Sequence, residues 1–272
     1  MSARRIAFIN EKGGSCKTTL AVNIAAYLAT EARQRVLLVD LDPQGQAGKA
    51  LGLDVRRLDA TMRELLVNDT LAPGQVVQRT RLPDLDVVAS NKRLADWPLE
   101  AAAQPRRELL VRDRLRPLFR SYDTVIFDSP PSLGLFSLGV MLAAEEIVIP
   151  VPMTYLGLDG CAEIVDTVQQ VRDRYQHTGL RVSLVVPTLY RPTRLADEIL
   201  TKLRGHFGDR VSRTVMSYNV RIDEAQSHGK SIWEYAPRCS GAVTLRALCE
   251  EIVALQPDAS PRASAPPAQA TA

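Results

Sequence analysis

A glycine- and lysine-containing segment near the N-terminus has the composition of a phosphate-binding loop. Residues 10–19 read Asn-Glu-Lys-Gly-Gly-Ser-Cys-Lys-Thr-Thr and separate an apolar run at residues 4–10 from a helical pattern at residues 17–29. Backbone N–H groups in such a loop, together with the N-terminus of the following helix, can hold phosphate oxygens. Lys17 would then reach the β- and γ-phosphates, and the Thr18 hydroxyl would bind Mg²⁺. The segment therefore predicts a nucleoside triphosphate site.

The glycines of this loop depart from the ordinary spacing G-x-x-x-x-G-K-[ST]. Gly13 and Gly14 would let the backbone approach an anion without a Cβ in the way. Counting back from Lys17, the ordinary pattern would place glycine at Glu11 and Cys16, and neither position is glycine. If position 16 needs a positive φ, a non-glycine residue there costs about 1–2 kcal/mol. For the loop taken alone, a plain glycine turn with solvated lysines stays open as an alternative.

Carboxylates end two of the predicted strands. Asp40 and Asp42 end the apolar run at residues 35–42, and Asp128 ends the run at residues 124–128. The carboxyl ends of parallel strands line the ligand crevice of an α/β sheet. There Asp128 would engage Mg²⁺ through water, as in a Walker B strand. A close pair such as Asp40 and Asp42 repels itself unless a cation or water network lies nearby. Solvated carboxylates in a turn are the alternative for each site alone.

Apolar runs without alternation recur along the chain, and helix-length patterns lie between several of them. Such runs are typical of strands that are buried on both faces. The pattern predicts an α/β fold with a doubly wound, mostly parallel twisted sheet flanked by helices. Residues 52–84 and 90–105 are less regular and are predicted to be helical connections. The predicted strands lie at residues 4–10, 35–42, 85–89, 124–128, 146–151, 182–188 and, more weakly, 211–216, and the predicted helices at residues 17–29, 106–119, 157–175 and 193–207.

Length and composition favour one soluble domain. The chain has 272 residues, of which 46% are hydrophobic and 24% charged, enough to bury a core without disulfides or metal. A signal-peptide pattern and a long apolar run are both missing, so we expect a cytoplasmic protein without a membrane-spanning helix. Residues 1–255 are expected to form the domain, and the Ala-, Pro- and Ser-rich residues 256–272 a flexible extension. No C-x-x-C pair, and hence no zinc site or disulfide framework, is formed by Cys16, Cys161, Cys239 and Cys249.

The loop resembles the deviant Walker A motif, K-G-G-x-G-K-[ST]-T, of the ParA/MinD family of P-loop ATPases, with Cys16 in place of a family glycine. The stretch Asp-Leu-Asp-Pro-Gln from Asp40 is similar to switch I of ParA proteins, and Asp-Ser-Pro-Pro-Ser-Leu-Gly from Asp128 is similar to the family's switch II. Looser matches extend the resemblance over nearly all of residues 4–255. As a set, the motifs resemble a ParA-type or Soj-type partition ATPase, which implies slow, Mg²⁺-dependent ATP hydrolysis.

The resemblance implies a role for each matched residue. Lys12 matches the signature lysine, which in the family crosses a dimer interface to the partner's nucleotide. Asp42 would orient or activate the attacking water. Asn219 would meet the adenine, with Ser217 standing where the family usually has proline. The implied set is catalytic Lys12, Lys17 and Asp42; nucleotide-binding Lys12, Gly13, Gly14, Ser15, Cys16, Lys17, Thr18, Thr19, Ser217 and Asn219; and Mg²⁺-binding Thr18, Asp40 and Asp128.

The resemblance also implies partners. ParA-type members dimerise with bound ATP, bind DNA non-specifically, and hydrolyse ATP when a ParB-like or other adaptor stimulates them, which segregates or positions cargo such as a chromosome or plasmid partition complex. We therefore expect a nucleoid-associated homodimer. Membrane attachment is not expected, because the C-terminus lacks the Lys-rich amphipathic helix of MinD-type members. Arg194 and Arg221 fall near the family's DNA-contacting arginines.

The charge distribution permits DNA binding without requiring it. The net charge is only +3, but residues 191–246 carry ten basic residues against six acidic ones. Doubled on a dimer, this excess could form a phosphate-binding surface, although a solvated helix surface is the alternative for each residue. Two other functions stay open. One is a nucleotide-gated binding or scaffold ATPase with little hydrolysis, which Cys16 makes conceivable. The other is a MinD-like or iron–sulfur-scaffold relative, although the latter would need closely placed cysteines.

Overall fold

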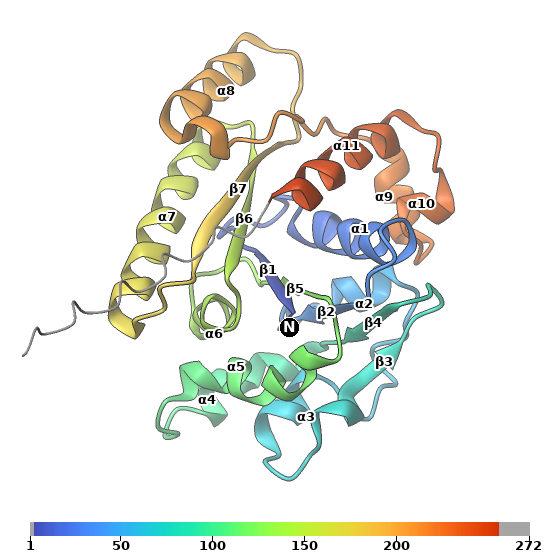
Figure 1. The fold of residues 1–272 in the computed structure, drawn as a ribbon, viewed down its shortest axis with the longest axis vertical. Coiled ribbons are helices and arrows are strands. Elements are labelled where there is room, and N and C mark those ends of the chain that lie inside the picture. The colour runs from blue at the N-terminus through green and yellow to red at the C-terminus, as the bar shows by residue number, and fades with distance from the viewer. Residues whose placement is uncertain (1–2, 256–272) are drawn as a thin grey trace, which may run out of the picture.

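The computed structural model describes residues 3–255, which form a seven-stranded sheet with helices on both faces (Figure 1). The strand order is β3-β4-β2-β5-β1-β6-β7, and every neighbouring pair is parallel except β3 and β4. The predicted doubly wound α/β fold is therefore confirmed. The strands are β1 (Arg4–Phe8), β2 (Val36–Asp40), β3 (Val77–Arg79), β4 (Leu85–Val88), β5 (Thr124–Asp128), β6 (Glu146–Pro152) and β7 (Arg181–Thr188).

Helices cover the sheet in two layers (Figure 1). One core lies under α1, α2, α9, α10 and α11, and the other lies under α3 to α8. Their bounds are α1 (Lys17–Thr30), α2 (Gln46–Ala50), α3 (Met62–Val67), α4 (Trp97–Glu100), α5 (Leu110–Leu115), α6 (Leu135–Ala143), α7 (Tyr155–Tyr175), α8 (Arg194–Phe207), α9 (Val220–Ser227), α10 (Ile232–Tyr235) and α11 (Ser240–Ala254), with 3₁₀ helices at Pro73–Val76, Lys92–Asp96, Arg107–Leu109, Arg116–Arg120 and Gly208–Arg210.

The central strand β1 shows why the apolar runs do not alternate. Ile6 and Phe8 enter the core under α1, whereas Ala7 and Ile9 enter the core on the opposite face. Because both faces of the strand are buried, every position selects an apolar side chain. The strand can therefore stay rigid while the loop that follows it is exposed at the carboxyl edge of the sheet.

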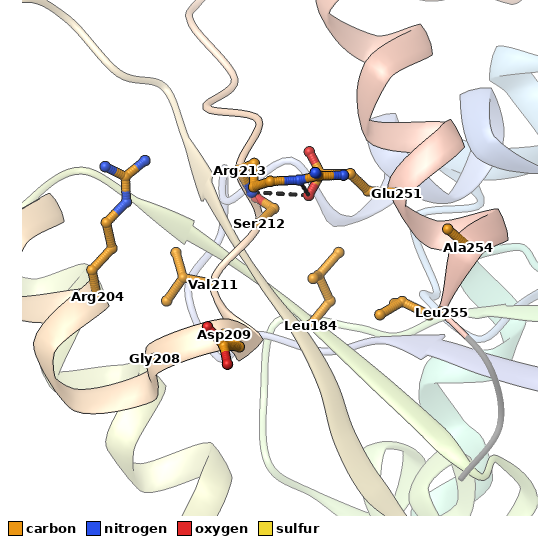
Figure 2. Close-up of a pocket in the computed structure, with 10 residues that line it drawn as sticks. All are labelled: Leu184, Arg204, Gly208, Asp209, Val211, Ser212, Arg213, Glu251, Ala254 and Leu255. Atoms are coloured by element: carbon orange, nitrogen blue, oxygen red, sulfur yellow. Dashed lines mark hydrogen bonds and ion pairs between the residues drawn. The ribbon is translucent and has the colours of Figure 1, made fainter.

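The weak strand predicted at residues 211–216 is wrong. Within the described part of the chain, Val211 forms only an isolated bridge to Val185 of β7. The next residues turn to α11, where the Glu251 carboxylate accepts hydrogen bonds from the backbone N–H groups of Arg213 (2.9 Å) and Thr214 (2.8 Å). A side chain thus satisfies the donors that a strand ladder would have used. Figure 2 shows the cavity of about 640 Å³ beside this contact.

Two other connections differ from their predictions. The helix predicted at residues 106–119 is broken, since α5 covers only Leu110–Leu115 and gives way to the 3₁₀ helix Arg116–Arg120. Pro117 has no N–H and so cannot continue the α-helical ladder. The stretch predicted to be helical at residues 52–84 contains β3, an antiparallel edge strand of three residues that is too short to leave a periodic pattern. Among the described helices, none is both long and apolar enough to cross a bilayer. The extension expected at residues 256–272 lies outside the described residues.

An ion pair at the amino end of the sheet tests the packing of the fold. Glu146 is buried and accepts two hydrogen bonds of 2.8 Å from the guanidinium of Arg4. Glu146→Ala should lower the free energy of unfolding by about 2–4 kcal/mol, because it leaves Arg4 without its buried counter-charge. Urea denaturation would measure the loss. Glu198→Ala removes the exposed pair with Arg194 and should change stability by no more than about 0.5 kcal/mol. Equal losses would contradict the assignment.

Candidate nucleotide-binding site

The loop between β1 and α1 has an open, strained backbone. Gly14 and Cys16 have positive φ angles of 70° and 73°. A Cβ built on Gly13 or Gly14 would have no atom within 4 Å. The space over the two glycines is therefore free for an anion, and the backbone can approach it closely. The loop leads directly into the N-terminus of α1, where the first N–H groups of a helix favour negative charge.

Cys16 has a left-handed backbone conformation, with a φ of 73°. This is the conformation for which the resembled motif has glycine at this position. Its backbone conformation costs about 1 kcal/mol relative to glycine. The half-buried side chain packs against the apolar core under α1, which offsets part of that cost. Burial, reinforced by the charge of Asp223, raises the pKa of the Cys16 thiol to about 11. The thiol is therefore neutral at physiological pH and adds no negative charge beside the phosphate positions.

Lys17 lies inside the loop. It is buried, and its Nζ donates a hydrogen bond of 3.1 Å to the carbonyl oxygen of Lys12. Burial lowers the pKa of the ammonium, and the carboxylates of Asp128 and Asp42 oppose this effect. The side chain thus places one cation between the glycine turn and the carboxylates at the strand ends.

Asp128, at the end of β5, carries the least satisfied polar group of the site. Both of its carboxylate oxygens are buried without a hydrogen-bond partner among residues 3–255. Burial raises the pKa of Asp128 to about 7, and Asp42 adds to this, while Thr18 and Lys17 act in the opposite direction. A buried unpaired carboxylate is costly, and a hydrated cation would relieve that cost. The Thr18 hydroxyl and the Asp128 carboxylate are the oxygen donors that Mg²⁺ uses beside phosphates, so the residues present fit the ion.

Asp40 differs from its neighbour in the sheet. It lies opposite Asp128 across β2 and β5, and its pKa is raised mainly by burial and secondly by the charge of Asp128. Its two oxygens accept hydrogen bonds from the backbone N–H groups of Asp42 (3.0 Å) and Ala47 (3.1 Å). Both oxygens thus hold the turn that follows β2, and the contact of Asp40 with Mg²⁺ stays a prediction.

Asp42, two residues further along the same turn, is less enclosed than Asp40. It is half-buried, and its Oδ1 accepts a hydrogen bond of 2.9 Å from the backbone N–H of Gln44. Its charge contributes to the pKa shifts of both Lys17 and Asp128. Asp42 is therefore the half-buried carboxylate of this turn that lies near the phosphate lysine, and its role toward water stays a prediction.

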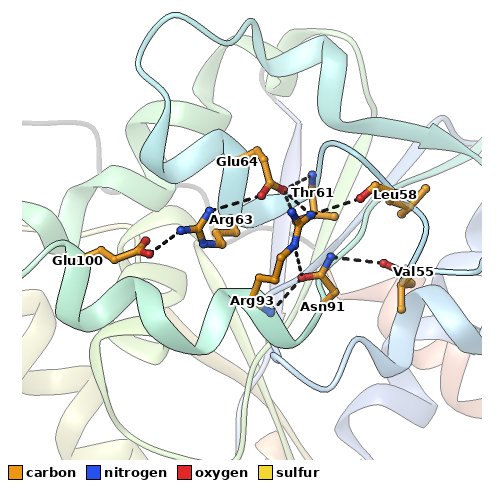
Figure 3. A network of polar contacts seen from close by, with 8 residues as sticks. All are labelled: Val55, Leu58, Thr61, Arg63, Glu64, Asn91, Arg93 and Glu100. Carbon is orange, nitrogen blue, oxygen red and sulfur yellow. Dashed lines mark hydrogen bonds and ion pairs between the residues drawn. The ribbon is translucent and has the colours of Figure 1, made fainter.

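A network of polar contacts joins the segment after α2 to the loop after β4, and the turn at Gly45 packs beside it (Figure 3). Gly45 has a φ of +62°, and an added Cβ would lie 2.5 Å from the carbonyl oxygen of Ser90. Next to it, the Asn91 amide donates to the carbonyl oxygen of Val55 at 3.3 Å. The turn thus packs directly on the loop after β4. The residues in the network are Val55, Leu58, Thr61, Arg63, Glu64, Asn91, Arg93 and Glu100.

Lys12, the predicted signature lysine, lies against α7. Its backbone N–H donates to Asn10 Oδ1 at 2.8 Å, and the Asn10 amide in turn donates to the carbonyl oxygen of Pro150 at 2.6 Å. A Cβ built on Gly160 would lie 3.6 Å from Lys12 Cε, so the side chain follows the helix surface. Across the loop, the Thr188 hydroxyl donates to the carbonyl oxygen of Ser15 at 3.3 Å. Asn10 and Thr188 were not predicted as site residues, because their contacts join strands distant in sequence.

Asn219, predicted to meet the adenine, and Ser217, predicted to bind the nucleotide, lie in the segment that leads into α9. Asn219 caps α9 by accepting a hydrogen bond from the N–H of Arg221 (3.0 Å), and its amide donates to Ser240 Oγ (3.1 Å). Ser217 is exposed. The same segment reaches the loop through Gln226, whose Nε2 donates to Thr19 Oγ1 at 2.7 Å. The fold therefore brings α9 next to the predicted site. The Thr19 hydroxyl, predicted to bind the nucleotide, accepts a hydrogen bond from α9.

The two predicted DNA-contacting arginines lie on the surface, near the start of α8 and α9. Arg194 pairs with Glu198 at 2.9 Å, and Arg221 pairs with Glu224 at 2.7 Å. Such exposed pairs are weak, so either guanidinium can exchange its partner for a phosphate.

Comparisons with known proteins agree with this geometry. A family model described as an AAA domain matches residues 3–182. The chain is 36% identical over 250 residues to the sporulation initiation inhibitor protein Soj of Bacillus subtilis, which covers 92% of this chain and 98% of Soj. It is 40% identical over 252 residues to the chromosome-partitioning ATPase Soj of Thermus thermophilus, which covers 92% and 96%. A solved cobyrinic acid a,c-diamide synthase from Mycobacterium smegmatis, with bound ATP analogue and magnesium, has a TM-score of 0.80 at 28% identity and covers 92% and 94%.

The fold and the loop define a P-loop ATPase, and the similarity over nearly the whole chain defines its kind. This protein belongs to the ParA/MinD-type family of ATPases, with chromosome-partitioning relatives of the Soj and ParA type. It is an ATPase that uses ATP and Mg²⁺, as the sequence predicted.

Replacing the buried lysine tests the phosphate site. Lys17→Ala should weaken ATP binding by at least about a hundredfold, because it removes the cation that the loop places at the β- and γ-phosphates. Isothermal titration calorimetry with ATP would measure the loss. Lys92→Ala, which removes an exposed lysine, should bind ATP like the parent protein. Unchanged ATP affinity in Lys17→Ala would refute the assignment of the loop.

The nucleotide-free stability of Asp128→Asn tests the buried carboxylate. Between the ordinary pKa of Asp and about 7, the folded state binds a proton that the unfolded state does not. The stability of the parent protein should therefore fall as pH rises through this range. Asp128→Asn should be the more stable protein at pH 8, with an advantage about 1 kcal/mol smaller at pH 6. Urea denaturation at the two pH values, without Mg²⁺, measures the difference. A pH-independent difference would show that Asp128 is not shifted.

Proposed function

We propose that this ATPase forms a homodimer with bound ATP, binds DNA without sequence preference and hydrolyses ATP slowly until an adaptor protein stimulates it. This cycle would segregate or position cargo such as a chromosome or plasmid partition complex. The observation that carries the proposal is the phosphate loop itself, in which Lys17 is enclosed and a second lysine, Lys12, extends along α7. Relatives named as chromosome-partitioning proteins support the same conclusion.

Each loop residue has a distinct task in this proposal. The backbone from Gly13 to Thr19, with the Lys17 ammonium, would bind the phosphates. Thr18 and Asp128 would hold Mg²⁺, whose charge would neutralise the phosphate oxygens when bound. Asp42 would orient the attacking water. Lys12 would reach the nucleotide of the second subunit.

Exposed apolar side chains next to the loop support dimerisation through this face. Tyr155 and Leu156, at the start of α7, are each 60% exposed, and Leu133 of the switch II loop is 36% exposed. Large exposed apolar groups of this kind mark interaction surfaces. A second subunit bound here would cover them and bring the two Lys12 side chains to the nucleotides.

DNA contact would come from a different part of the surface. Arg194 and Arg221 are exposed, and each forms a weak surface ion pair that a DNA phosphate could replace. A dimer would present two copies of each arginine. Sequence-independent contact with phosphates would place the protein on the nucleoid, within the cytoplasm. We propose that residues 1–255 constitute this single ATPase domain, that residues 256–272 form an appended segment, and that no membrane contact is involved.

Binding to duplex DNA of arbitrary sequence tests the proposal. Fluorescence anisotropy should show binding with ATP but not with ADP or without nucleotide, and the affinity should fall steeply with salt because counterions are released. Arg194→Ala with Arg221→Ala should weaken this binding about tenfold or more, while Arg56→Ala with Arg57→Ala should not. Absence of binding in every nucleotide state, with ATP turnover intact, would leave an ATPase that acts on another matrix.

A further inference from the structure

A groove lined by arginine lies on the face covered by α5, α6 and α7, and the proposed function uses only Leu133 at its far end. We propose that this groove binds an acidic segment of a partner protein, one that also carries apolar side chains. The proposal concerns a surface separate from Arg194 and Arg221, and it does not depend on DNA binding.

The groove consists of two adjoining hollows that share Tyr175. The larger, of about 850 Å³, lies between the 3₁₀ helix Arg116–Arg120, the end of α6 and the end of α7. The smaller, of about 490 Å³, continues between α6 and α7 to Leu133 and Gly134 in the switch II loop. The wall between α5 and α6 is tightly packed, because a Cβ added to Gly139 would lie 2.8 Å from Val111 Cγ2. The walls are therefore formed before any partner binds.

The charge in this groove is one-sided. Among the described residues that line the two hollows, six are arginines and one, Glu108, is acidic. Arg5 and Arg112 are compensated from just outside by Glu145 and Asp113. The other four form no ion pair within 4.0 Å inside residues 3–255, and these are Arg107, Arg116, Arg120 and Arg174. Four uncompensated guanidinium groups favour a partner with several carboxylates.

Apolar side chains that a partner could cover lie in the smaller hollow. Leu135, Leu138 and Tyr175 are half-buried there, whereas Phe119, Leu142 and Ala143 of the larger hollow are at most 5% exposed. Duplex DNA offers anionic groups but no apolar group that would cover the three half-buried side chains, whereas an acidic peptide with apolar side chains offers both. Apolar side chains beside arginines are typical of protein interfaces. The chemistry of the groove therefore favours a protein segment over a nucleic acid.

Carbonyl groups at the ends of α6 and α7 would oppose an anion, but two of them are already occupied. The carbonyl oxygen of Ala143 accepts a hydrogen bond from Arg5 Nε at 2.9 Å, and that of Ala144 accepts one from His177 Nε2 at 2.7 Å. These contacts turn donors toward the helix ends and cancel part of their negative potential. The exposed side chains of Arg116 and Arg120 therefore make the local electrostatic potential positive.

A partner bound at the far end of the groove would contact the loop that begins in the nucleotide site. Leu133 and Gly134 belong to the segment that links Asp128 to α6. A partner that contacts them restricts the loop that starts at the buried carboxylate. Occupancy of the groove should therefore alter ATP turnover as well as fill a surface.

A short synthetic peptide of glutamate and leucine serves as the test probe for the full-length protein. It should bind with a salt-dependent affinity at least about tenfold tighter than the same peptide with lysine in place of glutamate. Arg116→Glu with Arg120→Glu should weaken binding about tenfold or more, and Arg116→Gln with Arg120→Gln should weaken it less. Arg56→Glu with Arg57→Glu, a matched change of charge elsewhere on the surface, should leave binding unchanged. Anisotropy of a labelled peptide measures each affinity.

Hydrogen exchange and DNA binding locate the effect. The bound peptide should protect residues 107–120 and 133–138 from exchange, and the groove variant should retain the ATP binding of the parent protein. The proposal is overturned if the variant with Arg116→Glu and Arg120→Glu binds the peptide as tightly as the variant with Arg56→Glu and Arg57→Glu. It is also overturned if the acidic and basic peptides bind with equal affinity. It is also overturned if protection appears only elsewhere. Loss of DNA binding in the groove variant, without any peptide preference, would assign the arginines to DNA instead.

Discussion

The structure depends on two carboxylates, Asp40 and Asp128, that end neighbouring parallel strands inside the protein. Their register across β2 and β5 places them side by side, and burial raises the pKa of each. Coulombic repulsion in a medium of low dielectric constant would make two charged groups here costly. The sheet tolerates the two carboxylates because different groups stabilise each of them.

Asp40 is stabilised locally, by two backbone N–H groups of the turn that follows it. Asp128 has no such partner among the described residues and relies on Lys17, Thr18 and a cation. The hydrogen bonds that hold Asp40 in the turn after β2 therefore leave Asp128 as the carboxylate that would hold Mg²⁺. The turn then places Asp42 at the same edge of the sheet as the glycine loop. One electrostatic constraint thus accounts for both the fixed turn after β2 and the unpartnered carboxylate at the end of β5.

Much of this arrangement could be predicted from sequence, because its signals are local. The buried strands, the glycine loop and α1 each follow from consecutive residues, and parallel topology then brings the strand ends together. Roles that depend on distant donors could not be read in that way. The N–H that Ala47 donates to Asp40 and the hydrogen bond from Gln226 to the Thr19 hydroxyl both come from residues outside the local motifs. Residues 211–216 resemble a strand because their competitor, Glu251, lies in another helix.

The arginine groove is hidden in sequence for a related reason. Four of its six arginines come from the basic stretch at residues 106–120, but the stretch alone does not show that Arg5 of β1 and Arg174 of α7 lie beside it. The break in helix 106–119 contributes directly, because the tighter 3₁₀ helix Arg116–Arg120 turns Arg120 away from the face that a continuous α-helix would give it. The fold therefore links two surfaces through one loop. Switch II begins at Asp128, in the nucleotide site, and ends where the groove begins. A change at the nucleotide site or in the groove therefore needs to pass only through residues 128–134 to reach the other site.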